Sequence, residues 1–225
     1  MSLRTIARRA CFSVAYRFYA RPRLRRTDRA RVMGYTLDVP PGVFHPGLFF
    51  SSKTFAHYLQ EAPLEGKAVL DMGCGSGILS LVAAGRGASV TSIDINPAAA
   101  EATRVNASRA RVRVRALCGN LFEPLGAGER FDTILFNPPF YTGNPKDMAA
   151  MAWHGGADYA IIRGFFSLAG RFVREAGSIL LILSSDMEIP RVSGIARAAG
   201  FSMECVHTRA LFFEELSVYE ARLLP

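Results

Sequence analysis

Short apolar runs alternate with longer amphipathic stretches along most of the chain. The runs have the length of strands, and several, such as Thr133–Phe136, are continuous as expected for parallel strands buried on both faces. The stretches between them place apolar residues at helical spacing. This alternation predicts a doubly wound α/β sheet. Strands are expected near residues 67–71, 88–93, 111–116, 131–136, 178–184, 201–207 and 213–221, and helices near 52–61, 77–86, 97–109, 157–175 and 189–199.

The first forty residues have a different character. Leu3, Ile6, Val14 and Phe18 recur at helical spacing, which predicts an amphipathic helix followed by an irregular Arg-rich segment. Residues 1–31 hold ten arginines and one acid, a balance of +9, whereas the whole chain carries +8, so the remainder is close to −1. The basic character therefore belongs to this segment.

We expect a basic N-terminal helical extension over residues 1–40 and a single globular domain over residues 41–225. Three roles are open for the extension: contact with the phosphates of RNA or a ribosomal surface, a membrane-surface or targeting function, or packing of a solvated helix on the domain. The packing role is favoured slightly, because an apolar stripe needs something to bury it.

Composition limits the class of protein. The chain has 225 residues, half of them apolar, and no apolar run reaches the ~18 residues of a membrane span. Its four cysteines form no C-x-x-C pair, which favours reduced thiols and a cytoplasmic location. Its four histidines lack the spacing of metal ligands, so no metal site is expected.

A glycine-rich turn separates a predicted strand from a predicted helix. In Asp71-Met-Gly-Cys-Gly-Ser-Gly77 the glycines let the backbone approach a ligand closely, and the helix that follows offers N–H groups at its N-terminus. The candidate ligand-binding residues of this turn are Asp71, Gly73, Cys74, Gly75 and Gly77.

The next predicted strand, 88–93, ends in Asp94. An acidic side chain in this place accepts hydrogen bonds from ribose hydroxyls in nucleotide-binding folds. Asp94 and the adjacent Ile95 are therefore expected to bind a nucleoside. The glycine spacing differs from the G-x-G-x-x-G of dinucleotide folds, which disfavours an NAD-dependent dehydrogenase.

Asn137, Pro138, Pro139 and Phe140 follow another apolar run. The prolines remove two backbone donors, so this corner presents acceptors, namely the Asn137 amide oxygen and the Pro138 carbonyl. Phe140 adds a flat apolar face for a planar amide or a base. Such a corner suits the NH₂ group of a substrate, and we expect these four residues to be catalytic.

The chain resembles the class I S-adenosylmethionine-dependent N-methyltransferases that modify amino or amide nitrogens. The resemblance rests on the order and spacing of Asp71-Met-Gly-Cys-Gly-Ser-Gly77, Asp94, Gly119-Asn120-Leu-Phe122 and Asn137-Pro-Pro-Phe140. It covers the chain from about Pro41 to the C-terminus. It implies a Rossmann-like seven-stranded sheet, a methyltransferase domain over residues 41–225 and S-adenosyl-L-methionine as the cofactor.

The related enzymes place an acid after the third strand, where it accepts a hydrogen bond from the adenine amino group. Here Asn120 stands in that place, so the resemblance implies an adenine contact without charge assistance. Leu121 and Phe122 are expected either to cover the adenine ring or to pack in the core. Asn137 is expected to line the cofactor site as well as the acceptor site.

The methyl acceptor is open among several classes. The stretch Ala152-Trp-His-Gly-Gly-Ala-Asp158 is similar to the A-W-x-G-G-x-D stretch of HemK/PrmC-type glutamine methyltransferases, especially the short branch that acts on peptide release factors. Pro41-Gly-Val-Phe44 and Phe140 resemble RNA guanine amino-group methyltransferases instead. A small-molecule N-methyltransferase, or a cofactor-binding structural or RNA-binding subunit, are the remaining alternatives.

Two details bear on the acceptor side. Gly47-Leu-Phe-Phe50 looks inserted relative to the glutamine-methyltransferase branch, and Trp153 is expected either to anchor its loop or to form a wall of the substrate site. For any acceptor, hydrogen bonds from its nitrogen to Asn137 and to the Pro138 carbonyl would orient the lone pair for in-line transfer of the methyl group.

Overall fold

The computed structural model describes residues 26–212 and 214–225. The strands of its main sheet are β3 (Ala68–Met72), β4 (Ser89–Asp94), β5 (Val114–Cys118), β6 (Phe131–Phe136), β7 (Val173–Ser184), β8 (Phe201–Ala210) and β9 (Glu215–Leu223). The helices are α3 (Phe50–Glu61), α4 (Ile78–Gly85), α5 (Pro97–Ala110), α6 (Met148–Met151), α7 (Ala160–Ala169) and α8 (Ile189–Ala198), with a 3₁₀ turn η2 (Ala157–Tyr159).

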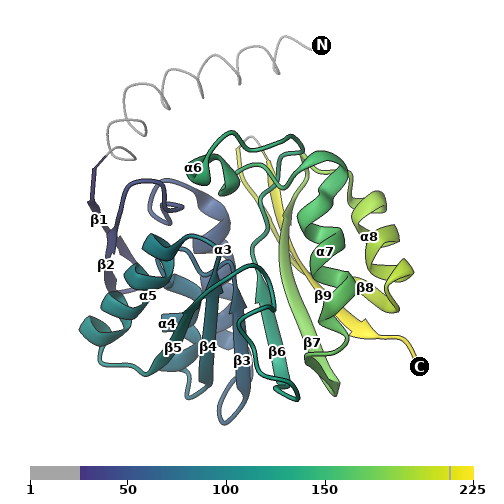
Figure 1. The fold of residues 1–225 in the computed structure, drawn as a ribbon, viewed down its shortest axis with the longest axis horizontal. Coiled ribbons are helices and arrows are strands. Elements are labelled where there is room, and N and C mark those ends of the chain that lie inside the picture. The colour runs from purple at the N-terminus through teal and green to yellow at the C-terminus, as the bar shows by residue number, and fades with distance from the viewer. Residues whose placement is uncertain (1–25, 213) are drawn as a thin grey trace.

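The predicted doubly wound α/β fold is confirmed. The strands lie in the order β5-β4-β3-β6-β7-β9-β8 (Figure 1). From β3 the chain builds outward through β4 to β5, returns to β6 on the other side of β3 and continues to β7, and β9 runs antiparallel to both of its neighbours, β7 and β8. The winding therefore reverses between β3 and β6, and ligand crevices form outside the carboxyl ends of strands at such a point.

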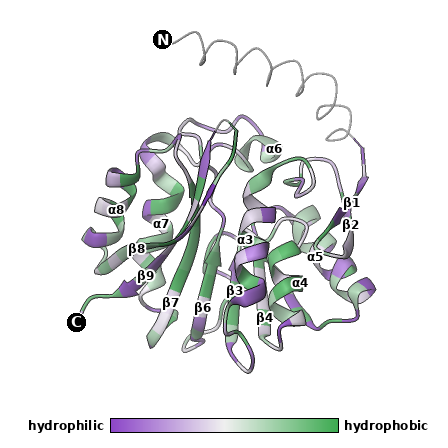
Figure 2. Cartoon of the chain, turned by 180° about the vertical axis from the view of Figure 1, so that it is seen from behind, coloured by the Kyte–Doolittle hydropathy of each residue, from purple (hydrophilic) through white to green (hydrophobic). Residues whose placement is uncertain are grey.

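The sheet separates two hydrophobic cores. On one face, α3, α4 and α5 pack with side chains such as Phe55 and Leu81, and on the other face α7 and α8 pack with Phe165 and Phe166. The central strands β6 and β7 are largely apolar because they are covered on both faces (Figure 2). Helix α5 begins as its sequence predicts, with Pro97 in the first turn and the Asn96 side chain accepting a hydrogen bond from the Ala98 N–H.

The N-terminal prediction needs correction. Residues Asp28–Val32 (β1) and Tyr35–Val39 (β2) form an antiparallel hairpin, and Met33 and Gly34 between them have the positive φ angles of a tight hairpin turn. Alternate hairpin side chains are buried in the first core. The helical extension predicted over residues 1–40 is therefore wrong for this part, and the boundary at residue 41 falls inside the packed body. The predicted amphipathic helix lies in residues 1–25, outside the described residues.

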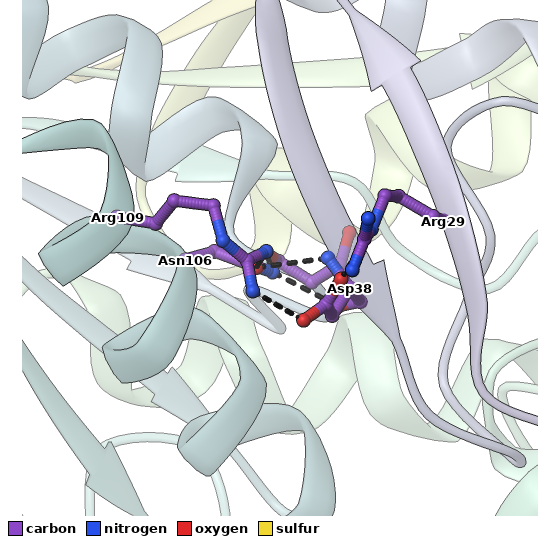
Figure 3. A network of polar contacts seen from close by, with 5 residues as sticks. Arg29, Asp38, Asn106 and Arg109 are labelled. Carbon is purple, nitrogen blue, oxygen red and sulfur yellow. Dashed lines mark hydrogen bonds and ion pairs between the residues drawn. The ribbon is translucent and has the colours of Figure 1, made fainter.

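A buried asparagine joins this hairpin to the rest of the fold (Figure 3). The Asn106 amide accepts from the Asp38 N–H (2.9 Å) and donates to the Asp38 carbonyl (3.0 Å) and to the Ser76 carbonyl of the glycine turn (2.9 Å). The Asp38 carboxylate binds Arg109 (2.5 Å) and Arg29 (3.1 Å), and the Arg109 hydrogen bond is the main cause that lowers the pKa of Asp38. The hairpin is thus tied both to α5 and to the glycine turn.

Some element boundaries differ from the prediction. Helix α5 continues to Ala110 and ends at Arg111, which has a positive φ of 58°, so β5 starts at Val114 rather than at residue 111. The helix predicted over 157–175 ends at Ala169, and β7 has already begun at Val173. The short helix α6 was not predicted.

Candidate functional site

The glycine turn after β3 is held against β4, because the N–H groups of Gly73 and Cys74 both donate to the Ile93 carbonyl (2.8 and 3.1 Å). Gly73 has a φ of +70°, and a Cβ there would enter open space. Gly77 has a φ of +87°, and a Cβ there would lie 2.9 Å from the Thr103 hydroxyl oxygen. Gly73 therefore leaves room for a ligand, whereas Gly77 allows α4 and α5 to pack closely.

Asp94 at the end of β4 clasps this turn. Its two carboxylate oxygens accept from the N–H groups of Gly75 and Asn96, both at 2.9 Å. Burial raises the pKa of Asp94, and these two hydrogen bonds act in the opposite direction. Each oxygen keeps a lone pair for a ligand hydroxyl. The adjacent Ile95, 36% exposed, adds apolar surface at the same edge.

Asp71 lies beneath the turn rather than at its open edge. Its side chain is fully buried, and Oδ2 accepts from the Ser80 hydroxyl (2.5 Å), which also contacts the Ser92 hydroxyl (2.7 Å). Within the described ranges Oδ1 has no hydrogen-bond partner. Burial raises the pKa of Asp71 to about 7. Burial also raises the pKa of the Cys74 thiol, so Cys74 stays protonated at neutral pH and fills space.

The predicted adenine end lies after β5. Asn120 is exposed and its amide nitrogen donates to the Glu123 carboxylate (3.2 Å), which leaves its oxygen to accept from a ligand. Leu121 is half-buried and has a positive φ of 47°. Phe122 is buried and stacks on Phe172, with ring centroids 4.7 Å apart. Of the two roles considered for Phe122, core packing is the one it has.

The acceptor corner is the direct neighbour of the glycine turn. Met72 at the end of β3 pairs with Phe136 at the end of β6, so Gly73 and Asn137 are the first residues beyond the paired register. Adjacent strands lie about 4.8 Å apart, which sets the scale of the separation between the two backbones. The fold therefore brings the two predicted motifs to one point of the sheet.

The Asn137 amide is held by the start of α3. Its nitrogen donates to the hydroxyl oxygens of Ser52 (3.1 Å) and Ser51 (3.4 Å). No donor among the described residues bonds to the Asn137 amide oxygen or to the Pro138 carbonyl. These are the two acceptors predicted for a substrate NH₂ group.

The Trp-His-Gly-Gly stretch braces this corner. Tyr141 donates its N–H to the Trp153 carbonyl (3.0 Å) and accepts from the Gly155 N–H (2.9 Å). A Cβ at Gly155 would lie 2.8 Å from Ile161 and 3.2 Å from Pro139. Glycine is required here because the stretch packs directly against the second proline of the corner.

Three aromatic rings join that stretch to the loop before α3. The Trp153 ring lies 4.9 Å from the Phe44 ring and 4.2 Å from the Phe49 ring, and the two phenylalanine rings are 5.0 Å apart. Trp153 is half-buried by these contacts, which supports an anchoring role. Phe49 belongs to the segment that looked inserted, so this segment packs against the Trp153 stretch.

The predicted site residues converge because β5, β4, β3 and β6 are adjacent strands and each carries candidates at its carboxyl end. The side chains of Asp71 and Cys74 are buried rather than directed to the open edge. Sequence reasoning missed Ser51, Ser52 and Phe49. The available signal was a polar pair at the start of an amphipathic helix, which is also the signature of an ordinary helix start.

Within the part of the chain that the structure describes, no group of three or more His, Cys, Asp or Glu side chains is arranged to hold a metal ion. No helix there is long and apolar enough to cross a membrane. Cys74, Cys118 and Cys205 are free thiols.

The sequence matches known methyltransferases. Residues 34–209 match the family model described as the methyltransferase small domain. A Methanocaldococcus jannaschii protein named as a protein N5-glutamine methyltransferase is 26% identical over 196 residues, which cover 84% of this chain and 96% of that protein. The release factor glutamine methyltransferase of Bordetella pertussis is 38% identical over 124 residues, or 52% of this chain and 44% of that protein. The matched stretch covers just under half of several other curated relatives, including a ribosomal protein L11 methyltransferase and a ribosomal RNA small subunit methyltransferase.

A solved structure shares the fold. The T. thermophilus 16S rRNA guanosine N2-methyltransferase, in complex with AdoMet and guanosine, superposes with a TM-score of 0.66 at 24% identity. The match covers 88% of this chain and 50% of that chain.

Proposed function

Because the chain belongs to the methyltransferase small domain family, we propose that it transfers the methyl group of S-adenosyl-L-methionine to the side-chain amide nitrogen of a protein glutamine. The glutamine acceptor is supported by the M. jannaschii relative, which carries that activity in its name and is covered almost completely. It is also supported by the Trp153 stretch that is shared in pattern with glutamine methyltransferases and braces the acceptor corner.

The residues at the carboxyl edge fit the cofactor. The open space at Gly73 and the free lone pairs of Asp94 suit a nucleoside whose ribose hydroxyls donate hydrogen bonds. We propose that the turn Gly73–Gly77 and Asp94–Ile95 hold its amino-acid and ribose parts, and that Asn120 and Leu121 contact adenine. When bound, S-adenosyl-L-methionine supplies an electrophilic methyl group on a sulfonium.

The observation that carries the proposed reaction is the orientation of Asn137. Its amide nitrogen is turned into the protein, so its oxygen and the Pro138 carbonyl can each accept one N–H of a primary amide. These bonds direct the nitrogen lone pair away from the corner and stabilise the positive charge that develops during transfer. Residues 137–140 contain no titratable side chain that could act as a general base. The extra proton therefore leaves the acceptor nitrogen after the methyl group has been transferred.

A tritiated-methyl assay tests the proposal. Purified protein is incubated with labelled S-adenosyl-L-methionine and, separately, with release-factor protein, ribosomal RNA and a metabolite fraction, and the products are hydrolysed and identified by mass spectrometry. We expect N5-methylglutamine. Detection of N2-methylguanosine would show that the acceptor is RNA and not glutamine. Label in none of the fractions would reject the enzymatic proposal.

Two variants separate chemistry from binding in this assay. Asn137→Ala should lower turnover by about a hundredfold, the effect of removing one preorganised polar group from a transition state, while cofactor affinity changes little. Asn144→Ala, at an exposed position beyond the corner, is the matched control and should keep full turnover.

We further propose a cytoplasmic location, supported by the free thiols of the three described cysteines. Contact with RNA or another anionic surface through the arginines of residues 1–31 is a separate proposal, supported by their charge balance of +9.

A further inference from the structure

An asparagine can serve as an acceptor corner in only one of its two amide orientations. A rotation of 180° about χ2 exchanges the oxygen with the NH₂ group and changes the shape very little, but it replaces an acceptor with a donor. A corner that presents the NH₂ group would repel the N–H groups of a substrate. Asn137-Pro-Pro-Phe140 contains nothing that selects between the two orientations.

The selection comes from a helix far away in the sequence. Ser52 and Ser51 lie 85 and 86 residues before Asn137, in the first turn of α3, and both are buried, with 5% and 4% of their surface exposed. The Asn137 NH₂ group has two hydrogens, and the two hydroxyl oxygens at 3.1 and 3.4 Å accept both. The nitrogen is therefore satisfied inside the protein, and the oxygen is left on the substrate side.

The position of these hydroxyls depends in turn on the loop before α3. The ring of Phe49, the residue just before the helix, packs on the Trp153 ring, with centroids 4.2 Å apart. The Trp153 carbonyl in turn accepts a hydrogen bond from the N–H of Tyr141, next to the corner. Both sides of the contact between the first turn of α3 and Asn137 are thus fixed, one by ring packing and the other by backbone hydrogen bonds. The serines can hold the amide in one place because the helix that carries them is itself held.

We propose that Ser51 and Ser52 are positioning residues for methyl transfer: they fix the Asn137 amide with its nitrogen inward and its oxygen toward the acceptor. The catalytic consequence rests on the proposed function, whereas the hydrogen bonding does not. An acceptor must then bring two N–H groups, one for the Asn137 oxygen and one for the Pro138 carbonyl, as a primary amide or amine does.

Thr54 provides a matched control in the same helix. Its side chain is buried, with 1% exposed, and its hydroxyl has no hydrogen-bond partner among the described residues. Thr54→Val therefore removes a buried hydroxyl from α3 without removing a hydrogen bond to the acceptor corner. Any general effect of losing a hydroxyl from this helix should appear in both sets of variants.

The first experiment measures kcat, the KM for the acceptor and the Kd for S-adenosyl-L-methionine. Ser52→Ala should lower kcat on the order of tenfold, and the Ser51→Ala/Ser52→Ala pair should approach the loss seen for Asn137→Ala, because an unheld amide spends most of its time misoriented. KM and Kd should change by less than about threefold, and Thr54→Val should match wild type. Ser52→Thr, which keeps a hydroxyl, should recover part of the loss.

A double-mutant cycle separates positioning from a general structural effect. If the serines act through Asn137, Ser52→Ala should have no further effect on kcat in the Asn137→Ala background. Full additivity, or wild-type kcat in the paired serine variant, would overturn the proposal. If Ser52→Ala fails to fold, Ser52→Cys takes its place, since it has nearly the same size and is a weaker acceptor.

The second experiment needs no activity. The side-chain NH₂ signals of Asn137, assigned by their absence in Asn137→Ala, should exchange slowly with solvent in wild type and in Thr54→Val. Exchange should be at least tenfold faster in the paired serine variant, and equal rates would reject the inference. If no acceptor is ever methylated, the proposed function fails while this measurement still decides whether the serines hold the amide.

Discussion

Replacing Asp71 with Asn should stabilise the cofactor-free protein by an amount that grows with pH. The Asp71 carboxyl is fully buried and its pKa is raised from 3.8 to about 7, chiefly by burial. The unfolded chain therefore ionises this group roughly three pH units before the folded protein does. Asn has the shape of the protonated acid, can still accept from the Ser80 hydroxyl, and never ionises.

The sign follows from proton linkage. A carboxyl with a raised pKa in the folded state contributes its full stability below the unfolded pKa, near 4, and loses it as the pH rises through about 7. Each pH unit in that window lowers the free energy of unfolding of the wild type by about 1.4 kcal/mol. Between pH 5 and pH 8 the difference between Asp71→Asn and wild type should therefore grow by up to about 3 kcal/mol and level off above pH 7.

The charged and titratable neighbours of Asp71 are Asp94 and Cys74, both of which are common to variant and wild type, so their own titration largely cancels in the difference. Urea unfolding at pH 5, 6, 7 and 8 without cofactor gives the measurement. A difference that stays flat, or shrinks with rising pH, would refute the reasoning.

Asp132→Asn is the control with the opposite sign. The Asp132 carboxylate binds Arg174 (2.7 Å) and the Ala68 N–H (2.8 Å), and the Arg174 hydrogen bond is the main cause that lowers its pKa. The stability that the Asp132 carboxylate contributes is fully present above the pKa of the unfolded chain. It is lost only as the pH falls through the lower pKa of the folded protein. Its difference from wild type should stay constant from pH 5 to pH 8.

Asp94→Ala should weaken S-adenosyl-L-methionine binding at least tenfold by calorimetry, because charge-assisted hydrogen bonds contribute about 1.5–3 kcal/mol each, and unchanged affinity in a folded variant would contradict the ribose assignment. Gly77→Ala should cost about 1–3 kcal/mol of stability through its clash with α5, whereas Gly194→Ala, at an open helix position, should add about 0.5–1 kcal/mol in the same urea experiment. Asn106→Ala should cost on the order of 2–4 kcal/mol, since it leaves buried backbone groups of the hairpin unpaired, and a loss below 1 kcal/mol would show that the tether is dispensable. Deleting residues 1–25, which carry seven arginines and no acid, should leave cofactor affinity intact and flatten the salt dependence of RNA binding; an equal salt slope in both forms would remove the polyanion role.

The sheet could be predicted because its central strands are buried on both faces and therefore read as continuous apolar runs. The hairpin could not be found in the same way. Arg29 and Arg31 alternate with Ala30 and Val32, which is a strand pattern. These two exposed arginines directly continue the Arg-rich run before them, so the sequence could not separate the strand from that run. Near residue 173 the apolar pattern passes from helix to strand without a strong break, so local pattern alone set the wrong boundary.

The convergence of the candidate cofactor residues could also be predicted from the sequence. Its candidates follow directly on predicted strands, and a doubly wound topology brings the carboxyl ends of adjacent strands together. The supports of Asn137 are of a different kind. Ser51 and Ser52 reach it only because α3, which packs on α4, β7 and β9, starts beside the residue that follows β6. Two serines at a helix start carry no local signal that separates a positioning role from an ordinary first turn.

The two halves of the site are therefore built by different means. The proposed cofactor half consists mainly of a backbone turn that is hydrogen-bonded to Asp94, whereas the proposed acceptor half depends on the orientation of Asn137, which Ser51 and Ser52 hold. Changes at Ser51 and Ser52 should alter turnover while leaving cofactor affinity nearly unchanged, because their side-chain hydrogen bonds reach Asn137 and not the glycine turn. With the function proposed above, this separation would give one fold a constant methyl donor site and an acceptor site that can be changed from a segment distant in the sequence.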